Sequence, residues 1–151
     1  MSAEDTGSGS GSFGWPVRVY YEDTDAGGVV YHANYLRFLE RARTERLRAA
    51  GFELDDLQRN HGILFAVRSV RMDFLKPARL NDVLRVTAEP EEIRFASLYF
   101  RQAVRRGRDE VLCTASVRVV CIAEGAFRPT AIPALLADRL RAAAGGVHDS
   151  A

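Results

Sequence analysis

Acidic side chains and one histidine gather in a short stretch between a strand-like segment and a helix-like segment. They are Glu22, Asp23, Asp25, His32 and, about two helical turns further on, Glu40. Asp25 precedes Gly27 and Gly28, and paired glycines let the backbone turn tightly and let a substrate approach the main chain. The helix expected after this turn would begin with free N–H groups and the positive end of its dipole. A carbonyl oxygen docked there would be polarised as in an oxyanion hole, with the Asp25 carboxylate beside it.

The chemistry open to such a carboxylate depends on the carbonyl in front of it. The carboxylate could attack the carbonyl carbon directly or direct a water molecule at it. An ordinary carboxylate, with a pKa of about 4, is a weak catalyst toward an amide or an oxygen ester. A thioester is more electrophilic and releases a good thiolate leaving group. The residues therefore favour hydrolysis of an acyl thioester over cleavage of a peptide bond.

Asp25 and Glu40 each also have a simpler, structural interpretation. Aspartate and glycine are common in connections between a strand and a helix, where Asp25 would only stabilise the turn. Glu40 would lie on a helix near polar side chains, as expected for a surface ion pair. These neighbours are Arg37, Arg43 and Thr44. The residues alone leave both the structural and the catalytic interpretation open.

Metal and nucleotide chemistry find little support in the sequence. His32 could bind a metal ion together with Asp23 and Asp25, but no second histidine has ligand-like spacing. We therefore expect no metal and no cofactor. The sequence also lacks a Gly-x-Ser-x-Gly elbow, a P-loop and a dinucleotide-binding fingerprint.

The composition is that of a globular domain. The 151 residues are enough for one domain with a core, and 47% of them are hydrophobic and 27% charged. The net charge of +1 gives no argument for a nucleic-acid partner. No run is long enough for a transmembrane helix, and residues 1–14 are Gly/Ser-rich without an apolar signal segment. We expect a cytoplasmic protein, with a peripheral position at the inner membrane as an alternative.

The two cysteines, Cys113 and Cys121, fall on one predicted strand, eight residues apart. An extended chain separates them by roughly 26 Å, which is too far for a disulfide. We expect two buried thiols in a reducing compartment.

Hydrophobic periodicity predicts one long helix and five strands. The helix spans residues 34–50, with Leu36 and Leu47 widening its apolar stripe, and Gly51 follows where a left-handed terminating residue is needed. Two further helices are expected at residues 54–60 and 132–144, and Gly107 marks a hairpin turn. Alternating apolar residues predict the strands: Val17, Val19 and Tyr21; Val70, Met72 and Phe74; Leu84, Val86 and Ala88; Leu98, Phe100 and Val104; and Val111, Cys113, Ala115, Val117, Val119 and Cys121.

This order of elements predicts an α+β fold in which an antiparallel sheet packs on a single central helix. The helix would be roughly 26 Å long, near the span of a strand of eight residues, so the sheet can wrap around it. Residues 15–143 would form one domain between flexible tails at residues 1–14 and 144–151.

The stretch from Trp15 to Tyr35 resembles the opening of the Tol–Pal-associated (YbgC-like) acyl-CoA thioesterases. These belong to the 4-hydroxybenzoyl-CoA thioesterase branch of the hotdog superfamily. The most specific part is Asp23-Thr24-Asp25-Ala26-Gly27-Gly28 followed by Tyr31-His32. Three later segments match more weakly: Glu40 to Glu45, Phe74 to Asp82 and Val119 to Cys121. The similarity runs from about Trp15 to Leu135, and the Gly/Ser-rich beginning is the main departure from it.

The resemblance implies a hotdog fold, with a five-stranded antiparallel sheet wrapped around one long helix, and hydrolysis of an acyl-CoA thioester. In the family the second aspartate of the motif is catalytic, which is Asp25 here, as nucleophile or general base. A backbone N–H near His32 would polarise the thioester carbonyl, and Tyr21, Tyr31 and His32 would shape the site. The resemblance also implies a homodimer with continuous sheets, usually paired into a homotetramer, with active sites at the subunit interface.

The CoA phosphates should lie on the surface, because the apolar pocket at the start of the helix can take only the acyl end. Gly27 and Gly28 would let the substrate approach the main chain. The best basic candidates for the phosphates are Arg71 and Lys76, on the strand that ends at Pro77, and Arg94, with Ser97 nearby. A solvated sheet edge is the alternative interpretation. An acyl carrier protein could replace CoA as the partner.

Two other functions fit the same sequence. One is a non-catalytic hotdog module that binds acyl carriers or partners at the cell envelope. The other is a hotdog dehydratase, or a thioesterase whose acid lies on the helix, with Glu40 as the active group. Comparing hydrolysis by Asp25→Asn and Glu40→Gln variants separates these functions.

Overall fold

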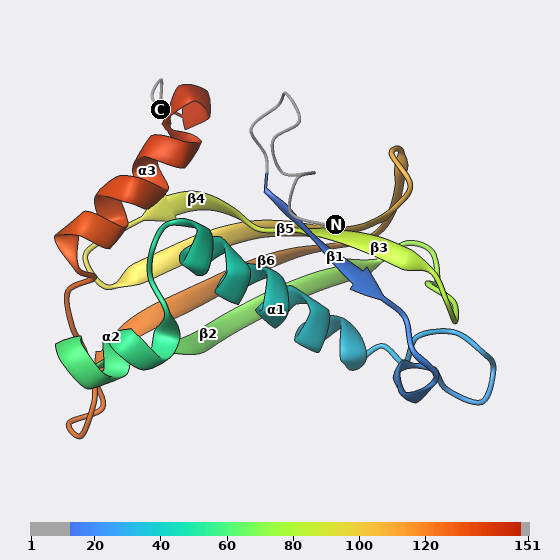
Figure 1. The fold of residues 1–151 in the computed structure, drawn as a ribbon, viewed down its shortest axis with the longest axis horizontal. Coiled ribbons are helices and arrows are strands. Elements are labelled where there is room, and N and C mark those ends of the chain that lie inside the picture. Colours follow the sequence, from blue (N-terminus) through green and yellow to red (C-terminus); the bar gives the residue numbers. More distant parts are fainter. Residues whose placement is uncertain (1–12, 149–151) are drawn as a thin grey trace.

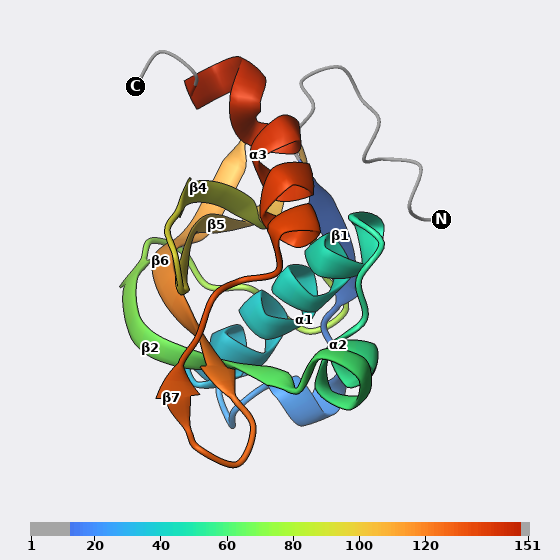
Figure 2. The same cartoon turned by 90° about the vertical axis from the view of Figure 1, so that its left-hand side faces the viewer.

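A curled antiparallel sheet holds one long helix on its concave face. The computed structural model describes residues 13–148, and their side chains as far as residue 143. The helix α1 (Asn34–Ala49) lies across the sheet in Figure 1, and the view along the sheet in Figure 2 shows the strands curving around it. The predicted arrangement of a sheet wrapped around a central helix is therefore confirmed.

The strands follow the order β1-β3-β5-β6-β2 across the sheet, and every neighbouring pair is antiparallel. Two short strands lie off this path, with β4 paired to β5 and β7 paired to β6. The strands are β1 (Gly14–Arg18), β2 (Ile63–Phe74), β3 (Val83–Thr87), β4 (Glu89–Ile93), β5 (Ser97–Arg106), β6 (Glu110–Ala123) and β7 (Arg128–Pro129).

The sheet has seven strands, two more than the five predicted. β3 pairs with residues 104–106 of β5 and β4 pairs with residues 98–101, so β4 continues the line of β3 after a break at Ala88. β7 has only two residues, too few for a period of two to be visible in the sequence. The five strands of the main path are the ones predicted.

α1 forms where its apolar residues recur at helical spacing, and that stripe packs on the sheet. The buried residues of the stripe are Tyr35, Phe38, Leu39, Ala42 and Leu47. Gly51 ends the helix with a φ of 95°, and the N–H of Phe52 returns to the carbonyl oxygen of Leu47 at 3.0 Å. Leu36 does not belong to the buried stripe as predicted, because 45% of it is exposed.

The first strand ends earlier than its alternating pattern predicts. Val17 and Val19 are buried as expected, but the chain leaves the sheet after Arg18. Tyr21 then lies in η2 (Tyr21–Asp23), a 3-10 turn, with 82% of its surface exposed. The prediction that Tyr21 faces the core is wrong because this turn rotates it out of the strand's period of two.

β2 is an edge strand, and this exposes residues that its pattern assigns to a buried face. It pairs only with β6 within the described chain, and its irregular pairing between Val67 and Ser69 is a bulge. Val70 is 38% exposed and Phe74 is 50% exposed. The alternation is correct, but the sheet does not continue beyond this edge to cover these side chains.

The other elements complete one domain. α2 (Leu54–His61) buries Leu57 but leaves Leu54 at 38% exposure, whereas both were expected to face inward. α3 (Ala134–His148) packs against β4. Residues 1–12 and 149–151 of the predicted tails lie outside the described residues. Among the described residues, Gly14 belongs to β1 and residues 144–148 belong to α3.

The two cysteines are free and buried, as predicted. Burial raises the pKa of Cys113 to about 11, with a smaller contribution from the nearby charge of Asp73, and it raises the pKa of Cys121 to about 11. Both side chains therefore remain neutral thiols at pH 7 and act as small core residues.

Candidate active site

A short loop joins η2 to α1 and presents Asp25 to solvent. The Asp25 side-chain Oδ1 accepts a hydrogen bond from the N–H of Gly27 at 2.8 Å. The Asp25 N–H bonds the carbonyl oxygen of Val29 at 2.9 Å, and the N–H of Gly28 bonds the carbonyl oxygen of Asp25 at 3.0 Å. Gly28 has a φ of 80°, a conformation that glycine adopts most readily. The loop thus orients an exposed carboxylate with its own backbone.

Asp23 has the opposite role, because it is buried and holds the base of the loop. Its side-chain Oδ2 accepts a hydrogen bond from the N–H of Tyr20 at 2.8 Å. Its carbonyl oxygen accepts bonds from the N–H of Tyr31 at 3.0 Å and from Nδ2 of Asn34 at 2.9 Å. Asp23 therefore ties both ends of the loop to the first turn of α1.

Two backbone donors beside this loop have no acceptor. The N–H groups of Asn34, Tyr35 and Leu36 are already bonded to carbonyl oxygens of the preceding turn. Those of His32 and Ala33 form no hydrogen bond within residues 13–148. They lie at the start of α1, where the helix dipole favours negative charge. A carbonyl oxygen that accumulates charge would find two suitable donors here.

An aromatic cluster forms one wall of this region. The ring of His32 lies 4.5 Å from that of Tyr31 and 6.2 Å from that of Phe74, measured between centroids. Phe74 also contacts Tyr35 at 5.4 Å. The Tyr35 hydroxyl accepts a hydrogen bond from the N–H of Ala78 at 3.1 Å, and burial raises the pKa of Tyr35. The end of β2 is thereby fixed beside the start of α1.

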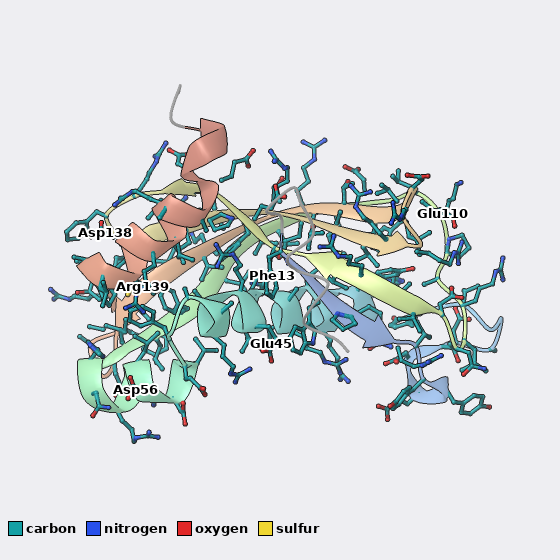
Figure 3. The ribbon with its side chains drawn as sticks, turned by 45° about the horizontal axis from the view of Figure 1, so that its top comes forward. Phe13, Glu45, Asp56, Glu110, Asp138 and Arg139 are labelled. Carbon is teal, nitrogen blue, oxygen red and sulfur yellow. The ribbon has the colours of Figure 1, made fainter. Side chains whose placement is uncertain are left out.

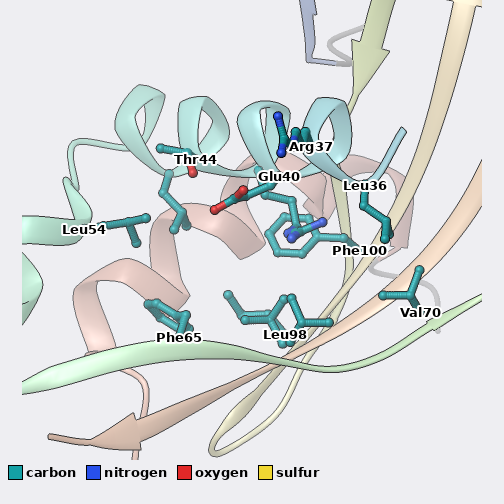
Figure 4. A pocket seen from close by; sticks show the side chains of 13 residues that line it. Leu36, Arg37, Glu40, Thr44, Leu54, Phe65, Val70, Leu98 and Phe100 are labelled. Carbon is teal, nitrogen blue, oxygen red and sulfur yellow. The ribbon is translucent and has the colours of Figure 1, made fainter. Parts of the chain in front are cut away.

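An apolar pocket runs along α1, between the helix and the sheet. Its volume is about 360 Å³, and its walls come from α1, α2, β2, β5 and β6. Figure 4 shows Leu36 toward one end and Leu54 toward the other, with Phe65, Leu98 and Phe100 on the sheet side. Val67 and Val70 are three residues apart, so in a regular strand they would point to opposite faces of the sheet. Both line the pocket because the bulge in β2 between Val67 and Ser69 adds one residue and turns them to the same face.

Glu40 is the only carboxylate among the described residues that line this pocket. Figure 4 shows its side chain on the α1 side of the cavity. Asp25 is not among the lining residues, so the exposed acid of the loop and the apolar pocket are separate features of one chain. Arg43 also lines the pocket, and its burial lowers the pKa of the guanidinium, while the charge of Glu40 acts in the opposite direction.

Comparison with known proteins assigns the fold and the chemistry to one family. A family model described as the thioesterase superfamily matches residues 27–113. The acyl-CoA thioesterase YbgC of Haemophilus influenzae is 46% identical over 121 residues, which cover 80% of this chain and 88% of that protein. The Helicobacter pylori (strain ATCC 700392 / 26695) acyl-CoA thioesterase YbgC is 35% identical over 133 residues, covering 83% and 97%. The chain belongs to the thioesterase superfamily.

The solved structures agree with this assignment. The crystal structure of a probable thioesterase from Bartonella henselae has a TM-score of 0.77 at 34% identity, and the match covers 81% of this chain and 99% of that one. The fold of the present chain is therefore the hotdog fold that its sequence predicts.

Only some of the predicted site residues lie close to one another within a single chain. Asp25, Gly27, Gly28, Tyr31 and His32 share the loop before α1. Tyr21 lies in η2, outside this loop. Lys76 follows β2 close to the loop, because the N–H of Val30 bonds the carbonyl oxygen of Ala78 at 2.8 Å.

Arg94 and Ser97 lie at the other end of the sheet. Ser97 is paired with Val120 of β6 and Phe74 with Cys113, seven residues apart on the same strand. That separation corresponds to about 23 Å along the sheet. Ser97 is also buried, where its hydroxyl accepts a hydrogen bond from Nη2 of Arg118 at 3.3 Å. One chain therefore does not bring Arg94 and Ser97 to Asp25.

The predicted phosphate-binding cations have different surroundings. Lys76 forms an ion pair with Glu110 at 3.5 Å, and Arg94 forms one with Glu92. The Arg94 guanidinium also lies 5.4 Å from the ring centre of Tyr99. Arg71 is exposed in the second half of β2, three residues before its end, and it has no ion pair with a described residue.

The described residues contain neither a metal-binding cluster nor a membrane-spanning helix. No group of three histidine, cysteine, aspartate or glutamate residues within the described part of the chain could hold a metal ion. None of the described helices is both long and apolar enough to span a bilayer.

Sequence reasoning missed Asn34 and Phe74 as parts of the site. Asn34 looks like an ordinary first residue of a helix, but its amide holds the carbonyl oxygen of Asp23. Phe74 looks like a core residue of a strand, but its ring borders His32. Its position just before the Leu75-Lys76-Pro77 break was the one local signal that it ends a strand.

Proposed function

We propose that this thioesterase hydrolyses acyl-CoA thioesters, with the Asp25 carboxylate as the reactive group. The observation that carries this proposal is an exposed carboxylate, oriented by Gly27, in the same loop as the unpaired N–H groups of His32 and Ala33. The similarity to proteins named acyl-CoA thioesterases supports CoA as the carrier.

In the proposed reaction, the acyl carbonyl oxygen accepts hydrogen bonds from His32 and Ala33 at the start of α1. These donors stabilise the negative charge that forms on that oxygen as the carbon becomes tetrahedral. As a general base, Asp25 takes a proton from a water molecule whose oxygen bonds to the carbon. As a nucleophile, Asp25 forms a mixed anhydride that water then hydrolyses. In both routes the C–S bond breaks, and CoA leaves as a thiolate that takes up a proton.

The acyl group would extend from the start of α1 into the apolar pocket along that helix. Leu36, one turn beyond His32, belongs to the pocket wall and gives the two regions a common border. Apolar walls of Leu, Val and Phe stabilise a hydrocarbon group by burying it. The rings of Tyr31, His32 and Phe74 would border the thioester itself.

We also propose that the active unit is a homodimer joined through β2, with a homotetramer as the larger assembly. β2 leaves one edge unpaired within the described chain, and apolar side chains are exposed on it, including Val67, Val70 and Phe74. A long exposed edge with apolar side chains favours pairing with a second chain. Antiparallel pairing of two β2 strands about a two-fold axis would bring the Arg94 end of one chain toward the Asp25 end of the other.

The dimer would give the nucleotide of CoA a basic surface at the interface. Lys76 would lie beside the loop of its own chain, and Arg94 and Ser97 would come from the partner. Arg71, three residues before the end of β2, would lie on the same strand that joins the two chains. An acyl carrier protein, whose thioester has the same chemistry, is the alternative partner.

Two buried free thiols support a reducing location such as the cytoplasm, with attachment to the inner membrane surface as the alternative.

The decisive experiment compares two variants on one acyl-CoA substrate. Asp25→Asn keeps the size and hydrogen-bonding capacity of the side chain but removes its charge, so we expect the folded protein to lose about a hundredfold or more in kcat. Glu40→Gln should retain activity within a few-fold of the unchanged protein. Release of free thiol measures the rate, and circular dichroism checks the fold.

A second candidate mechanism uses Glu40, because it is the acid that lines the apolar pocket. It predicts the reverse result, with hydrolysis lost in Glu40→Gln and retained in Asp25→Asn. A non-catalytic binding module predicts acyl-CoA binding without turnover, and neither substitution would then change the measured rate.

A further inference from the structure

A second pocket lies at the opposite end of α1 from the Asp25 loop. Its volume is about 430 Å³, and its wall combines two arginines, Arg46 and Arg139, with alanine and glycine residues only. Arg46 belongs to the last turn of α1, and twelve residues of helix separate it from Asn34, which corresponds to about 18 Å. This pocket shares no lining residue with the apolar pocket along α1.

Arg46 is a buried cation with no acidic partner among residues 13–148. Only 7% of its surface is exposed, yet its guanidinium forms no hydrogen bond and no ion pair within the described part of the chain. Its one specific contact is with the ring of Phe13, 5.9 Å from the guanidinium carbon to the ring centre. Burial lowers the pKa of Arg46, as expected for a charged group removed from water.

Arg139 is held rigidly on the other side of the same pocket. Its Nη1 donates a hydrogen bond of 2.8 Å to the carbonyl oxygen of Ala50, and its guanidinium lies 5.4 Å from the centre of the Phe52 ring. Gly51 leaves room for Nη1 of Arg139 beside the main chain, and its positive φ is the stronger reason for glycine at this position. Figure 3 shows Arg139 on the side of α3 that faces α1.

Most carbonyl oxygens at this helix end are already bonded. The carbonyl oxygens of Arg46, Leu47 and Arg48 already accept bonds from the N–H groups of residues 50–52, and that of Ala50 is bonded to Arg139. Arg139 forms no ion pair with a described residue, whereas Arg48, on the outer face of the same turn, pairs with Glu45 and Glu53. Two guanidiniums without carboxylates therefore border one cavity.

We propose that this pocket is an anion-binding site for a phosphate group. Two planar guanidiniums, each fixed against an aromatic ring, offer paired N–H donors that match phosphate oxygens. The alanine and glycine wall lets such a group approach both cations. The phosphate would supply the negative charge that Arg46 lacks, which offsets the cost of its burial. The site is distinct from the thioester chemistry proposed at Asp25.

The experiment titrates the full-length protein with inorganic phosphate by isothermal calorimetry, with chloride adjusted to keep the ionic strength constant. We expect one saturable site per chain. Arg46→Gln and Arg139→Gln should each weaken phosphate binding about tenfold or more, because each removes a charge-assisted contact. Ala142→Glu places a carboxylate on the exposed side of the pocket wall while keeping both arginines, so it should abolish phosphate binding. Arg48→Gln is the matched control, and its dissociation constant should not change.

Free phosphate and the phosphates of CoA are distinguished by repeating the titration with saturating CoA. Competition identifies CoA as the source of the phosphate, and an unchanged dissociation constant identifies a free anion. The proposal is overturned if the unchanged protein shows no saturable phosphate binding. It is equally overturned if the folded Ala142→Glu variant binds phosphate as the unchanged protein does.

Discussion

Two aspartates that are two residues apart have opposite surroundings. Asp23 is 6% exposed and accepts a hydrogen bond from the Tyr20 N–H, whereas Asp25 is exposed and bonds only within its own turn. The buried carboxylate maintains the loop, and the exposed one is free to meet a substrate. We therefore expect the same residue type to contribute to stability at position 23 and to chemistry at position 25.

Substitution of each aspartate by alanine should separate these two roles. Asp23→Ala leaves the partly buried Tyr20 N–H without its side-chain acceptor, so we expect the free energy of unfolding to fall by about 1–3 kcal/mol. Asp25→Ala should change it by less than about 1 kcal/mol, because solvent can replace the bond to Gly27. Urea unfolding measures both. Equal losses of stability in the two variants would contradict the division of roles.

At the scale of elements, one polar residue fixes α1 to the sheet. Gln102 occupies a core-facing position of β5 between Phe100 and Val104 and is 1% exposed. Its Nε2 donates to the carbonyl oxygens of Leu39 at 3.1 Å and Thr87 at 3.0 Å. Its Oε1 accepts a bond of 3.0 Å from Nη1 of Arg43. α1, β3 and β5 thus share one buried amide, which sets the position of the helix on the sheet.

Gln102→Leu keeps the volume of the side chain but removes all three bonds and leaves Arg43 without its acceptor. We expect the free energy of unfolding to fall by about 2–4 kcal/mol. The double variant Gln102→Leu with Arg43→Met removes the stranded cation as well. The free energy of unfolding should fall clearly less in the double variant than the sum of its decreases in the two single variants. A double-mutant cycle by urea unfolding measures this difference. Additive losses would show that Arg43 and Gln102 are not coupled.

At the scale of the whole molecule, we expect the proposed site to be complete only in a dimer. Asp25 lies at one end of the sheet and Arg94 at the other, so a single chain does not let them act on one substrate. Sedimentation should therefore show a homodimer or a larger assembly, and dilution to a monomer should abolish turnover. An active monomer would contradict the shared site.

Mixed dimers test whether Arg94 acts across the interface. Arg94→Ala alone should raise KM for acyl-CoA and leave kcat nearly unchanged, because a phosphate contact favours substrate and transition state alike. A mixed dimer of Asp25→Asn with Arg94→Ala contains one site in which an intact Asp25 meets an intact Arg94 from the partner. That site should show the KM of the unchanged protein. If Arg94 acted within its own chain, the mixed dimer would keep the raised KM.

An acyl-pantetheine without the nucleotide is the control substrate, and its KM should not respond to Arg94→Ala.

The sequence by itself determined the elements whose causes are local. The apolar stripe of α1, the left-handed Gly51 and the period of two in β6 each depend on neighbouring residues. The structure confirms Gly51, the stripe of α1 apart from Leu36, and the period of two from Cys113 to Cys121. Val111 was wrongly assigned to the buried face of β6, because the register shift beside it buries Leu112 instead. The Asp25 loop could also be predicted, because turn-forming glycines and the start of a helix are visible within ten residues. The resemblance to a family then supplied the hotdog fold, which the family match confirms.

Only the tertiary structure decided what depends on contacts between distant segments. The sequence could not indicate that Tyr21 leaves the strand, that β2 is an edge, or that Phe74 borders His32. In the sequence, Gln102 interrupts the apolar pattern of β5. The structure explains this polar residue, because its side chain bonds the carbonyl oxygen of Leu39. Arg46 reads as one surface arginine among many until α3 and Phe13 bury it. Periodicity reports which face of an element is apolar, but burial and hydrogen bonding depend on what the rest of the chain packs against that face.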